Sequence, residues 1–211
     1  MVKEGYVWTL APLLAALAAG ALGLAWASVP LLGLAGVLLL LAAFMAYFFR
    51  DPERASPPER TVIVSPADGR VTLVGKLSPG DADSPTIVSI FLSPLDVHIN
   101  RSPISGTVLD VTYTKGRFKP ATSDSASLVN EQNALTIKGD DGMTVVCKQI
   151  AGVLARRIVC WKRPGDRLEL GERFGLIKFG SRTDLLMPPE VSVLVSAGER
   201  VRGGVTVIGR F

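Results

Sequence analysis

Three short stretches of the sequence contain the residue types that acid–base and nucleophilic chemistry require. His98, the only histidine, lies in SPLDVHINRSP, Asp68 lies in SPADG, and Ser181 follows Gly180 in KFGSR. A histidine titrates near neutral pH and can move protons, a carboxylate can orient it, and a serine hydroxyl can act as a nucleophile. Taken one at a time, each stretch is also typical of an ordinary turn or strand end.

Further polar and sulfur-containing residues lie near these stretches. Arg101 closes the histidine stretch and Arg182 follows Ser181, and guanidinium groups bind carboxylates and phosphates in two-pronged geometry. Ser181 is not part of a G-x-S-x-G motif, so the pattern does not support a nucleophile elbow. The spacing of Cys147 and Cys160 matches no metal-binding or redox motif, so we expect two core cysteines and no metal site.

An apolar N-terminal segment precedes all of these stretches. No Asp, Glu, Lys, Arg or His occurs at positions 5–49, which excludes both a fully soluble protein and a single membrane span. Pro30 interrupts the run and predicts a helical hairpin, with helices at about 6–27 and 30–49, so that residues 1–49 form a membrane anchor. A signal peptide fits poorly because the run is too long. Basic residues flank both ends, which predicts a catalytic domain on the cytoplasmic side of the cell membrane. The depth of the hairpin is left open.

The rest of the chain predicts one β domain behind a linker. Residues 50–60 are rich in proline and charge and indicate the linker. Residues 61–211 contain short β segments between turn residues and no long helical periodicity, which predicts a mainly β barrel or sandwich. The sequence GDRLELG at 165–171 is echoed by GERVRGG at 198–204. Paired turns of this kind resemble the hammerhead sandwiches of lipoyl and biotinyl carrier domains, although the modifiable lysine motif of those carriers is absent.

Two connections between the predicted strands are unusual. Residues 115–133 (KGRFKPATSDSASLVNEQN) are polar and contain few strand formers. A long irregular segment of this kind indicates either a functional loop or a surface excursion, and composition favours neither. Residues 151–155 predict a short helical or turn piece.

The motifs, taken in order, resemble a known family. SPADG, SPLDVHINRSP, GRFKPA…NEQN, QIAGVLARRIVCW and FGLIKFGSRTDLLMP are similar to segments of the short-form phosphatidylserine decarboxylase proenzymes, and the resemblance covers nearly all of residues 50–211. The FGS segment is its most specific part. The resemblance implies that residues 61–211 form a pyruvoyl-dependent decarboxylase domain, which converts phosphatidylserine in the membrane into phosphatidylethanolamine and CO₂.

The resemblance also implies a mechanism. The chain would cut itself between Gly180 and Ser181, and Ser181 would become an N-terminal pyruvoyl group, so that no external cofactor is needed. Residues 1–180 and 181–211 would remain associated as two chains. The substrate amine would form a Schiff base with the pyruvoyl group, whose carbonyl accepts the electrons released with CO₂. Gly180 suits this cleavage because it has no Cβ to hinder attack and tolerates a strained backbone.

One position departs from the family pattern. Longer-form members carry H-x-x-H where this chain has His98 and Arg101. The second histidine of the long forms is associated with self-cleavage, so His98 either serves both cleavage and decarboxylation or shares one of these tasks with Arg101. An arginine stays protonated and is a poor base, but it can hold a carboxylate or phosphate or stabilise an oxyanion. By the resemblance, Asp68, His98 and Ser181 form a triad, and Arg101 and Arg182 are candidates for binding the substrate.

Two other functions are compatible with parts of the sequence. A non-enzymatic, membrane-anchored β-sandwich adaptor would explain the helices and the glycine turns, but not the joint presence of SPLDVH and FGSR. A membrane serine hydrolase would use Ser181, with Lys178 as its base, and would keep the chain intact.

A net charge of +4 on 211 residues is ordinary, and we expect no nucleic-acid partner. A homo-oligomer is compatible with the sequence, which leaves the oligomeric state open.

Overall fold

The computed structural model describes residues 1–211 apart from 60, 122, 124–125 and 154–156. The chain divides into two compact units, Met1–Pro52 and Glu53–Phe211, which are described separately below. The short helical or turn segment expected at 151–155 lies partly outside the described residues, because these do not include 154 and 155.

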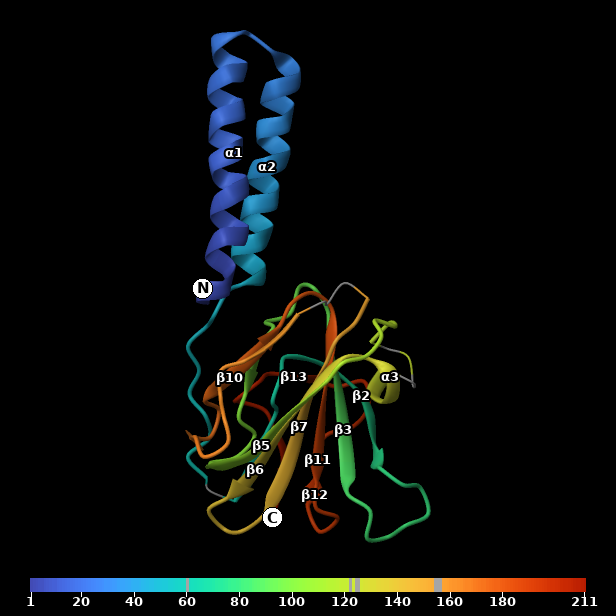
Figure 1. The fold of residues 1–211 in the computed structure, drawn as a ribbon. Coiled ribbons are helices and arrows are strands. Elements are labelled where there is room, and N and C mark those ends of the chain that lie inside the picture. The colour runs from blue at the N-terminus through green and yellow to red at the C-terminus, as the bar shows by residue number, and fades with distance from the viewer. Residues whose placement is uncertain (60, 122, 124–125, 154–156) are drawn as a thin grey trace. The chain divides into compact units, whose positions relative to one another are not determined.

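The first unit is the expected pair of apolar helices. A short 3₁₀ turn, η1 (Lys3–Gly5), leads into α1 (Tyr6–Ala25), and α2 (Val29–Phe48) returns beside it (Figure 1). Pro30 occupies the first turn of α2, where its missing N–H costs nothing. Small side chains such as Ala16 and Ala35 are buried within this unit, and many large ones such as Leu14 and Leu40 are exposed, which suits contact with lipid. Both helices are long and apolar enough to cross a membrane.

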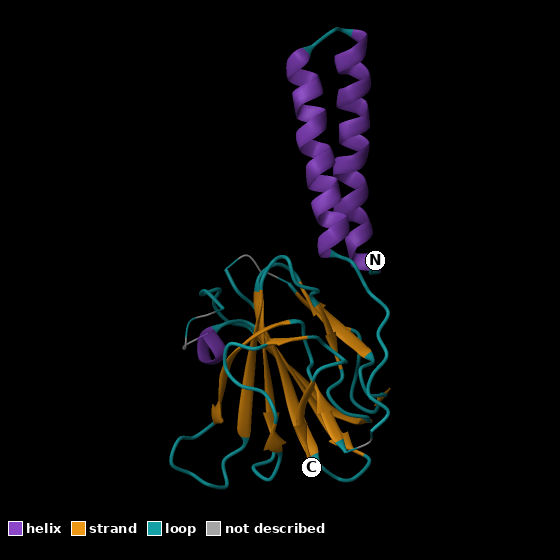
Figure 2. Ribbon diagram, turned by 180° about the vertical axis from the view of Figure 1, so that it is seen from behind, coloured by secondary structure: helices purple, strands orange, loops and turns teal. Residues whose placement is uncertain are grey.

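The second unit is mainly β, as the sequence predicts (Figure 2). An eight-stranded sheet has the order β13-β2-β3-β11-β7-β6-β5-β9, and two three-stranded sheets have the orders β1-β14-β12 and β4-β10-β8. Neighbouring strands are antiparallel throughout these sheets. The elements are β1 (Val62–Val64), β2 (Gly69–Lys76), β3 (Thr86–Leu92), β4 (Ile99–Arg101), β5 (Gly106–Thr114), α3 (Ala126–Val129), β6 (Gln132–Gly139), β7 (Thr144–Ile150), β8 (Ile158–Cys160), β9 (Arg167–Leu168), β10 (Arg173–Ile177), β11 (Ser181–Met187), β12 (Ser192–Val193), β13 (Arg200–Val201) and β14 (Val207–Arg210).

Alternating side chains of the large sheet form the hydrophobic core. Leu135 of β6, Cys147 of β7, Leu185 of β11 and Val88 of β3 are fully buried in one cluster. Successive side chains of a strand face opposite sides, so one register fixes which residues enter this core. β11 lies between β3 and β7 and is buried along its whole length. The strand that begins at Ser181 is thus a central one.

The two glycine-containing repeats occupy equivalent places in this unit. Their strands, β9 and β13, are the two edges of the eight-stranded sheet. Their glycines Gly171 and Gly204 have left-handed φ values of +73° and +75°, and their backbones lie close enough that a Cβ on either would come within 3.3 Å of the other. The two similar sequences thus occupy similar positions in the fold, at opposite edges of one sheet. The likeness to lipoyl domains stays a prediction.

Candidate active site

Ser181 lies at a strained turn with its hydroxyl buried. The two preceding residues, Phe179 and Gly180, have φ values of +64° and +54°, in the left-handed region. A non-glycine residue there costs about 1–3 kcal/mol, so the surrounding fold must impose this conformation. Ser181 is 0% exposed, and its Oγ makes no hydrogen bond in the part of the chain that the structure describes. A buried hydroxyl is usually satisfied, so this exception makes Ser181 a candidate functional group.

His98 is buried just before β4, beside the strand that leads to Ser181. Its backbone carbonyl accepts a hydrogen bond from Ile177 N–H at 3.2 Å, where β4 pairs with β10. Its Nδ1 lies 3.0 Å from the carbonyl oxygen of Asp96. A carbonyl can only accept, so this contact places the proton of a neutral ring on Nδ1 and leaves the lone pair on Nε2. The ring is thereby prepared to take up a proton at Nε2.

The carboxylate of Asp96 stiffens the turn that holds His98. It accepts hydrogen bonds from the backbone N–H and the hydroxyl of Ser93, at 2.9 and 2.8 Å, and it also pairs with Arg200. These contacts fix the Asp96 backbone, whose carbonyl orients the imidazole.

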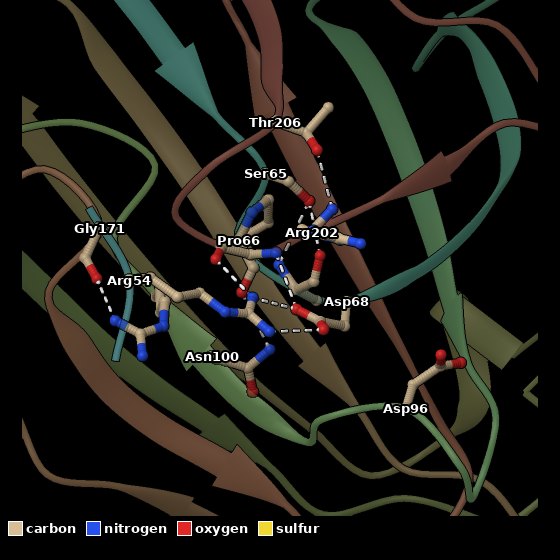
Figure 3. A network of polar contacts seen from close by, with 12 residues as sticks. Arg54, Ser65, Pro66, Asp68, Asp96, Asn100, Gly171, Arg202 and Thr206 are labelled. Atoms are coloured by element: carbon tan, nitrogen blue, oxygen red, sulfur yellow. Dashed lines mark hydrogen bonds and ion pairs between the residues drawn. The ribbon is translucent and has the colours of Figure 1, made fainter. Parts of the chain in front are cut away.

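Asp68 belongs to a separate, densely bonded turn (Figure 3). Its two oxygens face Arg54 in a two-pronged ion pair, with Nη2–Oδ2 at 2.7 Å, and Oδ1 also accepts the Gly203 N–H at 2.8 Å. Arg54 donates in addition to the carbonyl of Gly203, at 2.7 Å. The hydrogen bonds of Asp68 among the described residues thus run to Arg54 and Gly203 rather than to His98. The triad of Asp68, His98 and Ser181 that the resemblance implies stays a prediction.

The two arginine candidates are both buried and bonded to protein groups. Arg101 donates from Nη1 to the carbonyl of Gly171 at 3.0 Å. Arg182 donates to both oxygens of Asp184, at 2.6 and 3.1 Å, and to Ser89 Oγ at 2.8 Å. Arg182 and Asp184 share the face of β11 opposite to Ser181, because side chains alternate along a strand. Asp184 thus neutralises Arg182 locally.

A chain of buried polar side chains on the Ser181 face of β11 was missed by the sequence reasoning. Asn133 donates to Gln149 at 3.0 Å, Gln149 to Asn100 at 2.9 Å, and Asn100 to the hydroxyl of Thr183 at 3.0 Å. Thr183 is two residues after Ser181, so both point to the same side. The signal available in the sequence is the presence of amide side chains within otherwise apolar strands. These bonds fix β4, β6, β7 and β11 against one another next to Ser181.

Neither cysteine is a candidate nucleophile. Burial raises the pKa of the Cys147 thiol well above its ordinary value of 9.0, and burial likewise raises that of Cys160. Both stay protonated at neutral pH, which suits structural residues. Within the described ranges, no group of three or more His, Cys, Asp or Glu side chains could hold a metal ion.

A buried serine at the first position of a central strand, preceded by two residues with left-handed φ values, defines a candidate self-processing site in a β domain. The family model for phosphatidylserine decarboxylase matches residues 41–209. The chain is 50% identical to a phosphatidylserine decarboxylase proenzyme of Solibacter usitatus, over 100% of this chain and 96% of that protein. It is 47% identical to those of Symbiobacterium thermophilum (100% and 95%) and Gluconobacter oxydans (94% and 91%). The chain therefore belongs to the phosphatidylserine decarboxylase family.

Proposed function

We propose that this protein decarboxylates phosphatidylserine to phosphatidylethanolamine, through a Schiff base with a pyruvoyl group that it generates from Ser181. Membership of the family supports the reaction. The observation that carries the self-processing is the Ser181 hydroxyl, which is buried without a hydrogen-bond partner among the described residues, directly behind two left-handed residues. This arrangement fits a pyruvoyl precursor because the buried hydroxyl is next to the carbonyl that it must attack.

The cleavage follows from these two residues. Ser181 Oγ attacks the carbonyl carbon of Gly180, the Oγ proton moves to a base, and the C–N bond breaks as the nitrogen is protonated, which leaves an ester. Removal of the α-proton of Ser181 then breaks its Cβ–Oγ bond and releases residues 1–180 with a C-terminal carboxylate. The remaining dehydroalanine tautomerises to an imine, and water converts the imine into a ketone with loss of ammonia. Backbone strain at Phe179, a non-glycine residue with a left-handed φ, raises the energy of the uncut chain and so favours the first step.

His98 is the proposed acid–base group for both stages. The bond from Nδ1 to the Asp96 carbonyl leaves Nε2 as the nitrogen that receives the Ser181 proton. The same nitrogen, once protonated, can return a proton to the α-carbon after CO₂ leaves. The pyruvoyl group supplies the electron sink when it is formed. Asp68 acts on His98 in one of two ways. It acts indirectly because the turn that contains Asp68 is hydrogen-bonded to β4, the strand that follows His98, or it acts directly once its carboxylate leaves Arg54.

The anionic headgroup requires cations at this site. Both Arg101 and Arg182 are candidates for binding the substrate carboxylate or phosphate, and binding at Arg182 would compete with its ion pair to Asp184. We further propose that residues 1–49 anchor the protein in the cell membrane, that residues 50–60 connect the anchor to the domain 61–211, and that this domain lies on the cytoplasmic side. Basic residues at both ends of the hairpin support this orientation. The anchor keeps the domain at the surface that contains its lipid substrate.

Intact-mass spectrometry of the purified protein tests this function. We expect two chains divided between Gly180 and Ser181, with the smaller chain lacking a normal N-terminal amine and gaining an adduct when borohydride and a primary amine are added. Ser181→Ala should remain a single uncut chain without decarboxylase activity, because it lacks the attacking hydroxyl.

The same measurement separates the alternatives. An active Ser181→Ala variant would overturn the pyruvoyl mechanism. A folded, intact wild-type chain that reacts with a phosphonate probe at Ser181 would instead indicate a hydrolase, and an intact, unreactive one would indicate an adaptor.

A further inference from the structure

We infer that Gly152 is a positioning residue for self-cleavage, which orients the carbonyl group of Gly180, and that the side chain of Asn130 holds Gly152 in place. The inference rests on the proposed cleavage between Gly180 and Ser181. It assigns a role to Asn130 of the irregular segment and to Gly152, which follows β7.

The backbone of Gly152 lies directly against the oxygen of the bond to be cut. A Cβ at position 152 would come within 2.2 Å of the Gly180 carbonyl oxygen and within 3.3 Å of the Ala121 Cβ. Carbon and oxygen atoms in non-bonded contact keep a separation of about 3.3–3.6 Å, so a side chain at position 152 would displace the carbonyl. Gly152 is not among the residues with positive φ. A glycine is therefore needed here for the approach of Gly180, and not for its own backbone conformation.

Asn130 ties this connection to the irregular segment. The side chain is 1% exposed. Its Nδ2 donates to the carbonyls of Ala151 and Lys119, both at 2.8 Å, and its Oδ1 accepts the Lys119 N–H at 2.9 Å. The Ala151 N–H in turn donates to the Glu131 carbonyl at 2.9 Å. The residue immediately before Gly152 is thus held on both its N–H and its carbonyl.

These contacts matter because the Gly180 carbonyl oxygen moves during cleavage. When Ser181 Oγ bonds to the carbonyl carbon, that carbon becomes tetrahedral and its oxygen takes up negative charge. The contact with Gly152 limits the directions in which this oxygen can point. The left-handed φ values of Phe179 and Gly180 set the direction in which the chain enters the peptide bond between Gly180 and Ser181. Together they hold the carbonyl in one orientation toward the serine, which is the requirement for a fast intramolecular attack.

The test compares Gly152→Ala with Gly75→Ala in the full chain. Gly75 lies in β2, and a Cβ there would meet no heavy atom within 4 Å. We expect Gly152→Ala to slow the appearance of residues 181–211 by about 10²-fold, as for a misplacement of about 1 Å. Gly75→Ala should cleave at the wild-type rate. Hydroxylamine cuts esters and not amides, so it should release no 181–211 chain from Gly152→Ala, because the defect precedes ester formation.

Asn130→Asp provides the second variant, in case Gly152→Ala does not fold. It keeps the acceptor for the Lys119 N–H and replaces the donor to the carbonyls of Ala151 and Lys119 by an oxygen. We expect cleavage to slow about tenfold in protein that still unfolds cooperatively on heating. Wild-type cleavage rates in both variants, with the wild-type chain cut at Ser181, would overturn this inference alone. An uncut wild-type chain would overturn the proposed function and this inference with it.

Discussion

The turn before Ser181 and the turn that contains Asp68 hold two of the three expected catalytic side chains, in opposite states of hydrogen bonding. The Ser181 hydroxyl has no partner among the described residues and follows two left-handed residues. The Asp68 carboxylate is met by Arg54 on both oxygens and by the Gly203 amide. The turn before Ser181 thus combines a strained backbone with a hydroxyl that lacks a hydrogen bond among the described residues. In the Asp68 turn, both carboxylate oxygens accept hydrogen bonds.

This difference separates a reacting group from a supporting one. Strain and a missing hydrogen bond each cost about 1–3 kcal/mol, and the Ser181 turn tolerates them because β11 is paired along its length with β3 and β7. The Asp68 turn stabilises the fold, and its backbone also binds β4, since Arg101 N–H donates to the Pro66 carbonyl at 2.9 Å. The following predictions test this division.

The largest effect is expected at His98, which we propose as the acid–base group. His98→Asn retains an N–H donor that can reach the Asp96 carbonyl and removes the basic Nε2. We expect the rate of self-cleavage, or of CO₂ release from phosphatidylserine vesicles, to fall by about 10²–10⁴-fold. Both rates are measured on protein whose thermal unfolding matches the wild type. Normal rates would mean that the Ser181 turn reacts without a histidine base.

A smaller effect is expected at Arg54. Arg54→Ala leaves the Asp68 carboxylate almost buried and without its cation, which should lower the free energy of unfolding by about 2–3 kcal/mol. The measurement is denaturant unfolding in the uncut Ser181→Ala background, so that cleavage does not contribute.

Arg167→Ala is the matched control for Arg54→Ala. It breaks an ion pair with Asp140 whose side chains are both 56% exposed, and it should leave the unfolding midpoint unchanged within error. Equal losses in the two variants would show that the Asp68 turn is not a supporting element.

The smallest effect concerns Cys147, whose thiol is buried in the core and protonated. Burial raises the pKa of its thiol above the ordinary 9.0, so the folded protein disfavours the thiolate and should lose stability as pH rises beyond about 9. At pH 8 we expect iodoacetamide to modify Cys147 no faster than the protein unfolds, as followed by mass spectrometry. Rapid modification would show that this part of the core is open, unlike the environment described for Ser181.

The sequence predicted the elements better than their contacts. The uncharged run with Pro30 was sufficient for two helices, although α1 ends at Ala25 because Ala27 adopts a φ of +49° in the connection. Alternation of apolar residues in β6 and β7 was sufficient for a β domain. Local patterns of this kind are set by residues close in the chain.

The site depended on contacts that no local pattern contains. Arg54 lies in the segment predicted to be a linker, and only the folded chain brings it to Asp68. Gly152 likewise contacts Gly180 through the packing of two loops. By contrast, the Arg182–Asp184 pair was within reach of sequence reasoning, since residues two apart on a strand share a face.

The central position of β11 has a consequence for how this protein can be made. Residues 181–211 supply β11 to the middle of the large sheet and also β13 and β14, which pair with β2 and β1. A peptide this short is below the size of about 40 residues at which chains begin to fold alone. Two genes that encoded the pieces separately would yield a sheet without its middle strand and a fragment without a fold. The two pieces therefore have to be translated as one continuous chain, which folds before the proposed cleavage.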